Sequence, residues 1–177
     1  MKSILKWLVL AWVLACLVCS NNVGASQTLR LGIDATASGT FDPHYATTDA
    51  DRIIVDMLFN GLMRYQPGNF PTIEPDLAED VPKPKMVEGK QCWTFVLRKG
   101  VRFHPGLQGE TAELTADDVI YSLQKAADPT RSAYASLYTG MIFKRLDDYT
   151  LQVVVDKPLS SALFLPRFTT AVGGADL

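Results

Sequence analysis

One stretch of the chain, residues 91–127, combines a strand pattern, a turn-rich loop and a capped helix in close succession. Trp93, Phe95 and Leu97 recur at every second position, which is typical of a strand that packs one face on a core. The loop that follows contains His104-Pro105-Gly106, and proline and glycine favour turns. These 37 residues therefore predict one packed unit of strand, loop and helix.

The helix of this unit is expected to begin after Thr115. Asp118 follows three residues later, which is the spacing of a capping box that satisfies two otherwise unpaired backbone amides. The apolar residues that follow fall on one helical face, and the run ends before a proline: Val119, Ile120, Leu123, Ala127 and Pro129.

The other elements are predicted by the same periodicities. They are a first strand at 28–33, a helix from 48 to about 59, a strand at 62–65, a short helix within 131–139, a hairpin of 141–146 with 150–155, and a last helix after Ser160. Four prolines between 71 and 84 exclude a long regular element there, and an irregular surface excursion is expected.

The helix after Thr48 has its own predicted cap and buried face. Thr48 is the N-cap, with Asp51 reaching back to it as in a capping box. The residues expected on the buried face are Ile53, Ile54, Met57 and Leu58.

The N-terminus has the pattern of an export signal. Lys2 and Lys6 precede an apolar run at 7–18, which is shorter than the roughly 20 residues that a membrane-spanning helix needs. Cleavage after Ala25 is expected, and lipid attachment through Cys16 is the alternative. The predicted domains are a signal peptide at 1–25 and the first-lobe segment described below at 26–177.

Composition narrows the function classes. The chain has a net charge of −2, which becomes −4 when the signal peptide and its two lysines are removed. No basic patch stands out, so nucleic acid is not expected as a partner. Cys92 is then the one cysteine left, and burial as a small apolar residue is favoured over reactivity. No cofactor and no metal site are expected.

Five stretches together resemble a known family: WTFVLRKGVRFHPG and LTADDVIYSL from the central unit, and TLRLGIDATASGTFDPH, FNGLMRYQPGNFPTIEPDLAED and LDDYTLQVVVDKPLSSALF around it. The chain is similar to the family-5 extracellular solute-binding proteins, the receptors of dipeptide, oligopeptide and nickel ABC importers. The resemblance implies an α/β fold, namely the mixed-sheet lobe of a two-lobed type II periplasmic binding protein, here incomplete.

The resemblance also implies a function. The chain is expected to be a periplasmic, monomeric substrate-binding component that binds a small peptide or other small solute and serves a cognate ABC transporter permease in the membrane. The loop after the first strand would border the ligand, with Ala37, Ser38, Gly39 and Thr40 as the binding residues; a solvated connector is the alternative. Residues 167–174 are expected on the same face.

Full members of the family have several hundred residues and close two lobes around the ligand. This chain is therefore expected to be a truncated product or a partial sequence that binds ligand weakly or not at all by itself.

The pair Tyr134 and Tyr138, at i and i+4, is expected to pack in the core, with stacking on a ligand as the alternative.

A secreted hydrolase is the competing function. Asp42, His44 and His104 could be combined into an acid-base site, but no serine elbow accompanies them. Two histidines without a zinc-binding spacing also make a poor metal site. Histidines that stabilise turns are the favoured interpretation, and the chain is not expected to be an enzyme.

Overall fold

A computed structural model describes residues 39–106, Gly109 and 111–170, together with Thr28, Arg30 and Gly32. The chain divides into two units, residues 1–33 and 34–177, and all described helices and strands belong to the second. The predicted signal peptide lies outside the described residues, and so do Leu29, Leu31 and Ile33 of the predicted first strand. None of the described helices combines the length and the apolar character that crossing a membrane requires.

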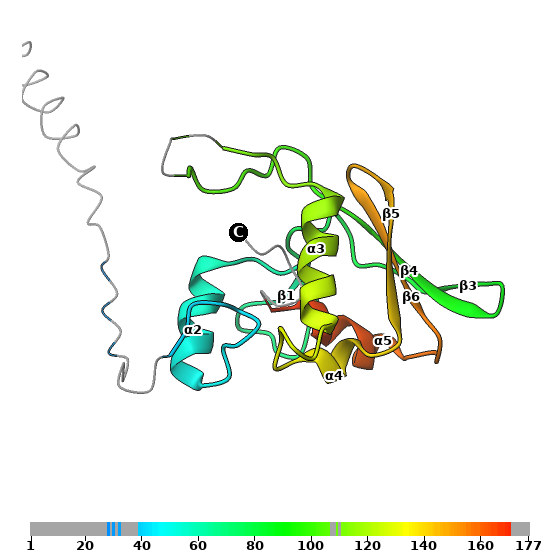
Figure 1. Cartoon of the computed structure of the whole chain (residues 1–177), viewed down its shortest axis with the longest axis horizontal. Coiled ribbons are helices and arrows are strands. Elements are labelled where there is room, and N and C mark those ends of the chain that lie inside the picture. Colours follow the sequence, from blue (N-terminus) through cyan, green and yellow to red (C-terminus); the bar gives the residue numbers. More distant parts are fainter. Residues whose placement is uncertain are drawn as a thin grey trace, which may run out of the picture. The chain divides into compact units, whose positions relative to one another are not determined.

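The second unit is built on a four-stranded sheet with the order β3-β4-β6-β5 (Figure 1). Its strands are β3 (Lys85–Val87), β4 (Lys90–Val96), β5 (Met141–Asp147) and β6 (Thr150–Val155). All pairings between them are antiparallel. The α/β composition is therefore as predicted, but the described strands show no parallel pairing, so a mixed sheet is not seen in this part of the chain.

The central strand β4 lies in the register that its sequence pattern predicts. Trp93 pairs with Val153 of β6, and Phe95 pairs with Leu151. All four side chains are fully buried. The β5–β6 hairpin turns close to the predicted position, and its second strand, β6, lies between β5 and β4 in the sheet.

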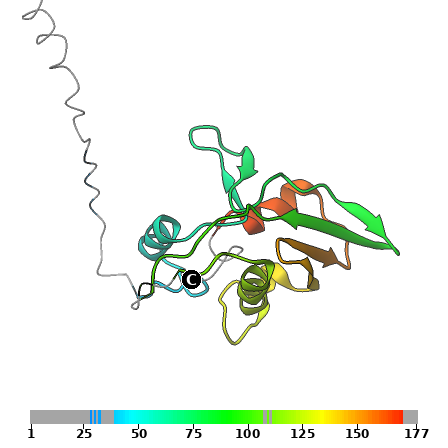
Figure 2. The same ribbon diagram turned by 90° about the horizontal axis from the view of Figure 1, so that it is seen from above.

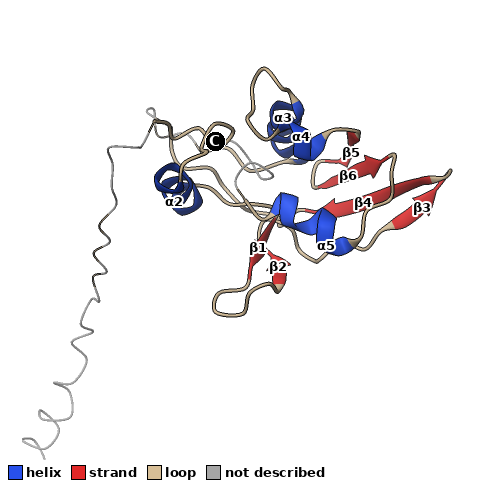
Figure 3. Cartoon of the chain, turned by 90° about the horizontal axis from the view of Figure 1, so that it is seen from below, coloured by secondary structure: helices blue, strands red, loops and turns tan. Residues whose placement is uncertain are grey.

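Aromatic rings from the end of the chain cover this inner face of the sheet. They come from the helix α5 (Ser161–Phe164) and the short 3-10 helix η2 (Leu165–Phe168), which lie beside β4 in Figure 3. Phe168 packs against Phe95 with a centroid distance of 5.1 Å. The core of the unit therefore joins the middle of the chain to its last described helices.

Helix α3 (Ala116–Ala127) begins and ends where the sequence predicts. The Asp118 carboxylate accepts hydrogen bonds from the backbone N–H and the hydroxyl of Thr115, at 2.8 and 2.7 Å. Val119 and Leu123 are fully buried. The helix packs on β5 and β6, and the four-residue helix α4 (Ala135–Tyr138) follows it (Figure 3).

Helix α2 (Asp49–Leu58) forms as predicted, but its predicted buried face is wrong. The Thr48 hydroxyl accepts from the Asp51 N–H at 3.2 Å. The buried side chains are Asp51 and Val55; Ile54 is half-buried, whereas Ile53, Met57 and Leu58 are 41%, 64% and 50% exposed. The spacing of apolar residues predicts which side of a helix is apolar, but not which side another segment covers. In the described chain, Ala46 and Phe59 cover the side of α2 around Val55.

The proline-rich segment is not a pure surface excursion. It contributes the strand β2 (Ile73–Pro75), which pairs with β1 (Met63–Tyr65) in a hairpin that projects from the sheet (Figure 2). Leu77 and Ala78 are then buried in the core. Glu79 donates its N–H to Val96 O at 2.8 Å, so this segment returns to the end of β4.

Gly61 precedes β1 at a point of close backbone approach. A Cβ atom at this position would lie 2.7 Å from Met63 O and 2.8 Å from Phe168 O. Real Cβ atoms do not approach backbone oxygens so closely. Gly61 therefore allows the start of the hairpin to pack directly against η2.

Candidate functional site

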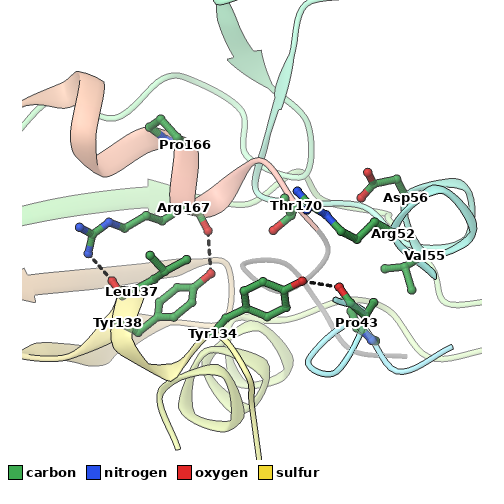
Figure 4. Close-up of a pocket in the computed structure, with 11 residues that line it drawn as sticks. Pro43, Arg52, Val55, Asp56, Tyr134, Leu137, Tyr138, Pro166, Arg167 and Thr170 are labelled. Atoms are coloured by element: carbon green, nitrogen blue, oxygen red, sulfur yellow. Dashed lines mark hydrogen bonds between the residues drawn. The ribbon is translucent and has the colours of Figure 1, made fainter. Parts of the chain in front are cut away.

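A hollow of about 160 Å³ opens between α2, the region of α4 and η2 (Figure 4). Its walls combine proline and aliphatic side chains with two tyrosines, two arginines and one carboxylate. The lining residues are Pro43, Ala46, Arg52, Val55, Asp56, Tyr134, Leu137, Tyr138, Pro166, Arg167 and Thr170. An apolar hollow with a few polar groups is the usual form of a small-molecule site.

The two tyrosines are held in place by hydrogen bonds to backbone oxygens. Tyr138 donates to Arg167 O at 2.7 Å, and Tyr134 donates to Ala46 O. Burial raises the pKa of Tyr138, so it is a neutral phenol at physiological pH. Tyr138 is buried in the core and the half-buried Tyr134 packs against it, as expected, and both residues also line the hollow.

Arg167 is one of two cations in the hollow, and its guanidinium is already engaged. The Nε–H donates to Leu163 O at 3.1 Å, and a terminal N–H donates to Leu137 O. These bonds fix η2 against α4 and α5. Of the residues predicted on the ligand face at 167–174, Arg167 and Thr170 line the hollow, and residues 171–174 lie outside the described part.

Arg52 and Asp56 are the other charged groups, one helical turn apart on α2. Burial raises the pKa of the Asp56 carboxyl, and the positive charge of Arg52 opposes this shift in part. Among the described residues, neither side chain makes a hydrogen bond or an ion pair. Sequence reasoning missed both residues, although their i, i+4 spacing on a predicted helix placed them on one face.

The predicted binding loop is described only at its end, since Ala37 and Ser38 lie outside the described residues. The N–H groups of Gly39 and Thr40 point to Asp51 Oδ1, at 2.9 and 3.4 Å. The loop is thus tied to the first turn of α2, next to Arg52. A ligand contact by residues 37–40 stays a prediction, and it would have to use groups other than these two N–H groups.

His44 is fully buried, and both ring nitrogens have partners. Nδ1 lies 3.3 Å from Asp42 Oδ1, and Nε2 lies 3.1 Å from Ser122 O. Lys125 Nζ approaches the same Asp42 carboxylate at 3.1 Å. This network ties the turn at 42–44 to α3, which is a structural role.

His104 is exposed on a separate small hollow, which His44 does not line. The acid-base site of the hydrolase hypothesis is therefore not assembled from these histidines. Within the described ranges, no three histidine, cysteine or acidic side chains are grouped as metal ligands. Cys92 is buried, as expected of a small apolar residue.

The chain matches the family model of bacterial extracellular solute-binding proteins, family 5, over residues 72–175, more than half of its length. It is 28% identical over 174 residues to di/tripeptide-binding protein 4 of Pseudomonas aeruginosa, covering 89% of this chain and 31% of that protein. It is 34% identical over 115 residues to the dipeptide-binding protein of Escherichia coli, covering 57% and 21%.

Solved structures of binding proteins are also similar to this chain. The binding protein MoaA from A. tumefaciens R10, in complex with mannopinic acid, is 35% identical with a TM-score of 0.65, over 76% of this chain and 26% of that one. The oligopeptide-binding protein AppA from Bacillus subtilis, in complex with a nonapeptide, is 25% identical with a TM-score of 0.59, over 74% and 24%.

The chain spans between 20% and 31% of the length of these curated relatives. Its structural neighbours are type II periplasmic binding proteins, of which it covers one part. Members of the matched family bind solutes for transport and are not enzymes. The match over residues 72–175 shows that this chain belongs to the bacterial extracellular solute-binding proteins of family 5.

Proposed function

We propose that this chain provides part of one lobe of the substrate-binding component of an ABC importer for peptides or similar small solutes. The family match is the observation that carries the proposal. Two relatives are named for dipeptides or tripeptides, and a Helicobacter pylori neighbour is described as ABC transporter-associated. The hollow between α2, α4 and η2 is the part of the described chain best suited to contact a solute.

The proposal includes export of the chain to the periplasm and a membrane permease as its partner. Residues 1–25 direct export and are removed, so that the rest acts in the periplasm and delivers solute to a membrane permease; anchoring through Cys16 is the alternative. The net charge of −4 after removal fits a monomeric exported protein without nucleic-acid contacts.

The geometry of the hollow supports a binding role. Its walls are preformed, because Tyr134, Tyr138 and Arg167 are held by hydrogen bonds to the backbone. A preformed wall lowers the entropy cost of binding. The hollow is partly open to solvent, and exclusion of water would need a second surface. We therefore expect weak binding by this chain and tight binding only when a second lobe closes over it.

The test is a ligand panel on the purified 177-residue chain, followed through its backbone amide NMR signals. The panel contains a dipeptide, a tetrapeptide, the nickel–histidine complex and mannopinic acid. Peptides are expected to shift signals of residues around the hollow at millimolar concentration and to be recovered intact. Peptide cleavage, or the absence of any shift with every compound, would contradict the proposal.

A further inference from the structure

The β3–β4 hairpin ends in an exposed tip, defined here as residues 83–90. The tip extends beyond the ends of β5 and β6 in Figures 1 and 2, and each of its residues is exposed. Val87 pairs with Lys90, so only Glu88 and Gly89 form the turn, with positive φ angles of 49° and 77°. A two-residue turn with this backbone follows the twist of its strands. The turn therefore gives the tip a defined shape.

The tip has a charge opposite to that of the chain. It contains three lysines and one acid, which gives a charge of +2: Lys83, Lys85, Lys90 and Glu88. The whole chain has a charge of −2, so the other residues together carry −4. Asp156 offsets Lys90 in part, in an ion pair of 2.9 Å, whereas neither Lys83 nor Lys85 forms an ion pair within the described ranges. The tip is thus a local cationic patch on an acidic protein.

Two apolar side chains lie among these lysines. Met86 and Val87 are 59% and 49% exposed. The strand alternation and the pairing of Val87 with Lys90 put Val87 on the same face as two lysines, Lys85 and Lys90, and Met86 on the other face. Lysines alone would be explained by protection of the edge strand β3 against pairing with other chains. Exposed apolar side chains do not serve that role, and they favour contact with another surface.

We propose that the tip is a contact surface for an anionic phospholipid bilayer. Apolar side chains enter the headgroup region of such a bilayer, while lysines keep their ammonium groups at the phosphates. A projecting tip suits a flat surface, and its local charge is complementary to anionic lipid although the chain as a whole is acidic. The inference adds a membrane contact to the protein and does not depend on solute binding by the hollow.

The test measures co-sedimentation with vesicles of pure phosphatidylcholine and of an equimolar mixture of phosphatidylcholine and phosphatidylglycerol. Residues 26–177 are used, which contain all described helices and strands, because the apolar run at 7–18 would itself enter bilayers. Binding should be at least about tenfold stronger to the anionic vesicles. The sign is informative, because an acidic protein without a cationic patch is repelled by them. The preference should be lost at about 1 M salt, which screens charges beyond about 3 Å.

Variants of the tip assign the binding to its residues. Lys83→Gln and Lys85→Gln should each weaken binding to the anionic vesicles about fivefold, the effect of one lysine near such a surface. Glu88→Asn should strengthen it by a similar factor, because the acid of the tip is removed and asparagine tolerates the positive φ angle. Met86→Ser should weaken binding about threefold and leave its salt dependence unchanged.

Two controls match these variants in residue type. Lys144→Gln removes an exposed lysine of β5, and Met57→Ser removes a 64% exposed methionine of α2. Neither should change vesicle binding. The tip variants are also compared in the 177-residue chain, where residues 1–25 contribute equally to each protein and the ratios between variants should be the same. Amide spectra with native dispersion verify that each variant is folded.

Several results would overturn the proposal. Equal binding to both kinds of vesicle, or binding to neither, would leave the lysines with edge protection alone. A loss in Lys144→Gln as large as that in Lys85→Gln would show a general charge effect. If polyglutamate bound with the same dependence on Lys85 and the vesicles did not bind, the tip would be assigned to an acidic protein surface instead.

Discussion

The rings of Trp93 and Phe164 stack with their centroids 4.1 Å apart and their planes 8° apart. Trp93 lies in the central strand β4 and Phe164 in α5, so this contact closes the core over the inner face of the sheet. Both side chains are fully buried, and Phe164 also packs against Phe168 at 4.7 Å. The position of η2, and with it one wall of the hollow, therefore depends on this stack.

Removal of the stacked ring should destabilise the unit strongly. Phe164→Ala deletes a fully buried ring and leaves a cavity, which typically costs about 3–5 kcal/mol of unfolding free energy. Chemical denaturation measures the change. Leu163→Ala is the control, because the neighbouring Leu163 is 60% exposed and its loss should change stability by less than about 0.5 kcal/mol. Equal effects of the two variants would contradict the described core.

Gly61 should not tolerate a side chain. In Gly61→Ala the new methyl group would meet Met63 O at 2.7 Å and Phe168 O at 2.8 Å, so the backbone has to move. We expect a loss of at least about 1–3 kcal/mol, the usual range for overpacking. Gly39→Ala is the matched control, since nothing lies within 4 Å of its added Cβ. A thermal melt of both variants decides the point, and an unchanged melting temperature for Gly61→Ala would refute the close approach.

The buried histidine should matter for stability and not for catalysis. His44→Ala leaves Ser122 O and part of the Asp42 carboxylate without their partner, which typically costs about 1–3 kcal/mol. His104→Ala, at an exposed position, should be neutral. Denaturation curves of the two variants test this difference. A hydrolytic activity that either substitution abolishes would favour the competing hydrolase function.

The stability of Asp56→Asn should depend on pH in a defined direction. A carboxyl group whose pKa is raised in the folded state binds its proton more tightly there than in the unfolded chain. Its stabilising contribution is therefore present at low pH and is lost as pH rises through the folded pKa. Asp56→Asn should be more stable than the wild type at pH 7, by less than about 0.5 kcal/mol because the side chain is only partly buried and remains accessible to solvent. The difference should vanish near pH 3.

Asp128→Asn provides the comparison of opposite sign. Hydrogen bonds from the hydroxyl and the N–H of Thr130 lower the pKa of Asp128. Its contribution is present above the unfolded pKa and is lost as pH falls through the folded one. This variant should be less stable than the wild type at pH 7 and approach it in acid. Melting temperatures across pH 3–7 measure both variants, and parallel profiles would contradict the environments assigned to the two carboxyl groups.

Local sequence patterns were sufficient for several elements. The alternation around Trp93 and Phe95 predicted β4, and the Thr115–Asp118 cap predicted the start of α3. The hairpin of β5 and β6 followed from two strand patterns, at 141–146 and 150–155, that flank Asp147-Asp148. Each of these depends on a side-chain period or a cap within a few neighbouring residues, so no distant contact was needed to predict it.

The sequence thus determined the class of the protein and its local elements, whereas tertiary packing decided which faces are covered and where the hollow lies. The apolar stripe of α2 predicted Ile53, Met57 and Leu58 as buried, but in the described chain it is Val55 that is covered. The hollow joins Arg52 to Arg167, residues more than a hundred positions apart. Periodicity within one element carries no information about which distant segment packs against it. The packing partner is decided only when all elements of the core come together.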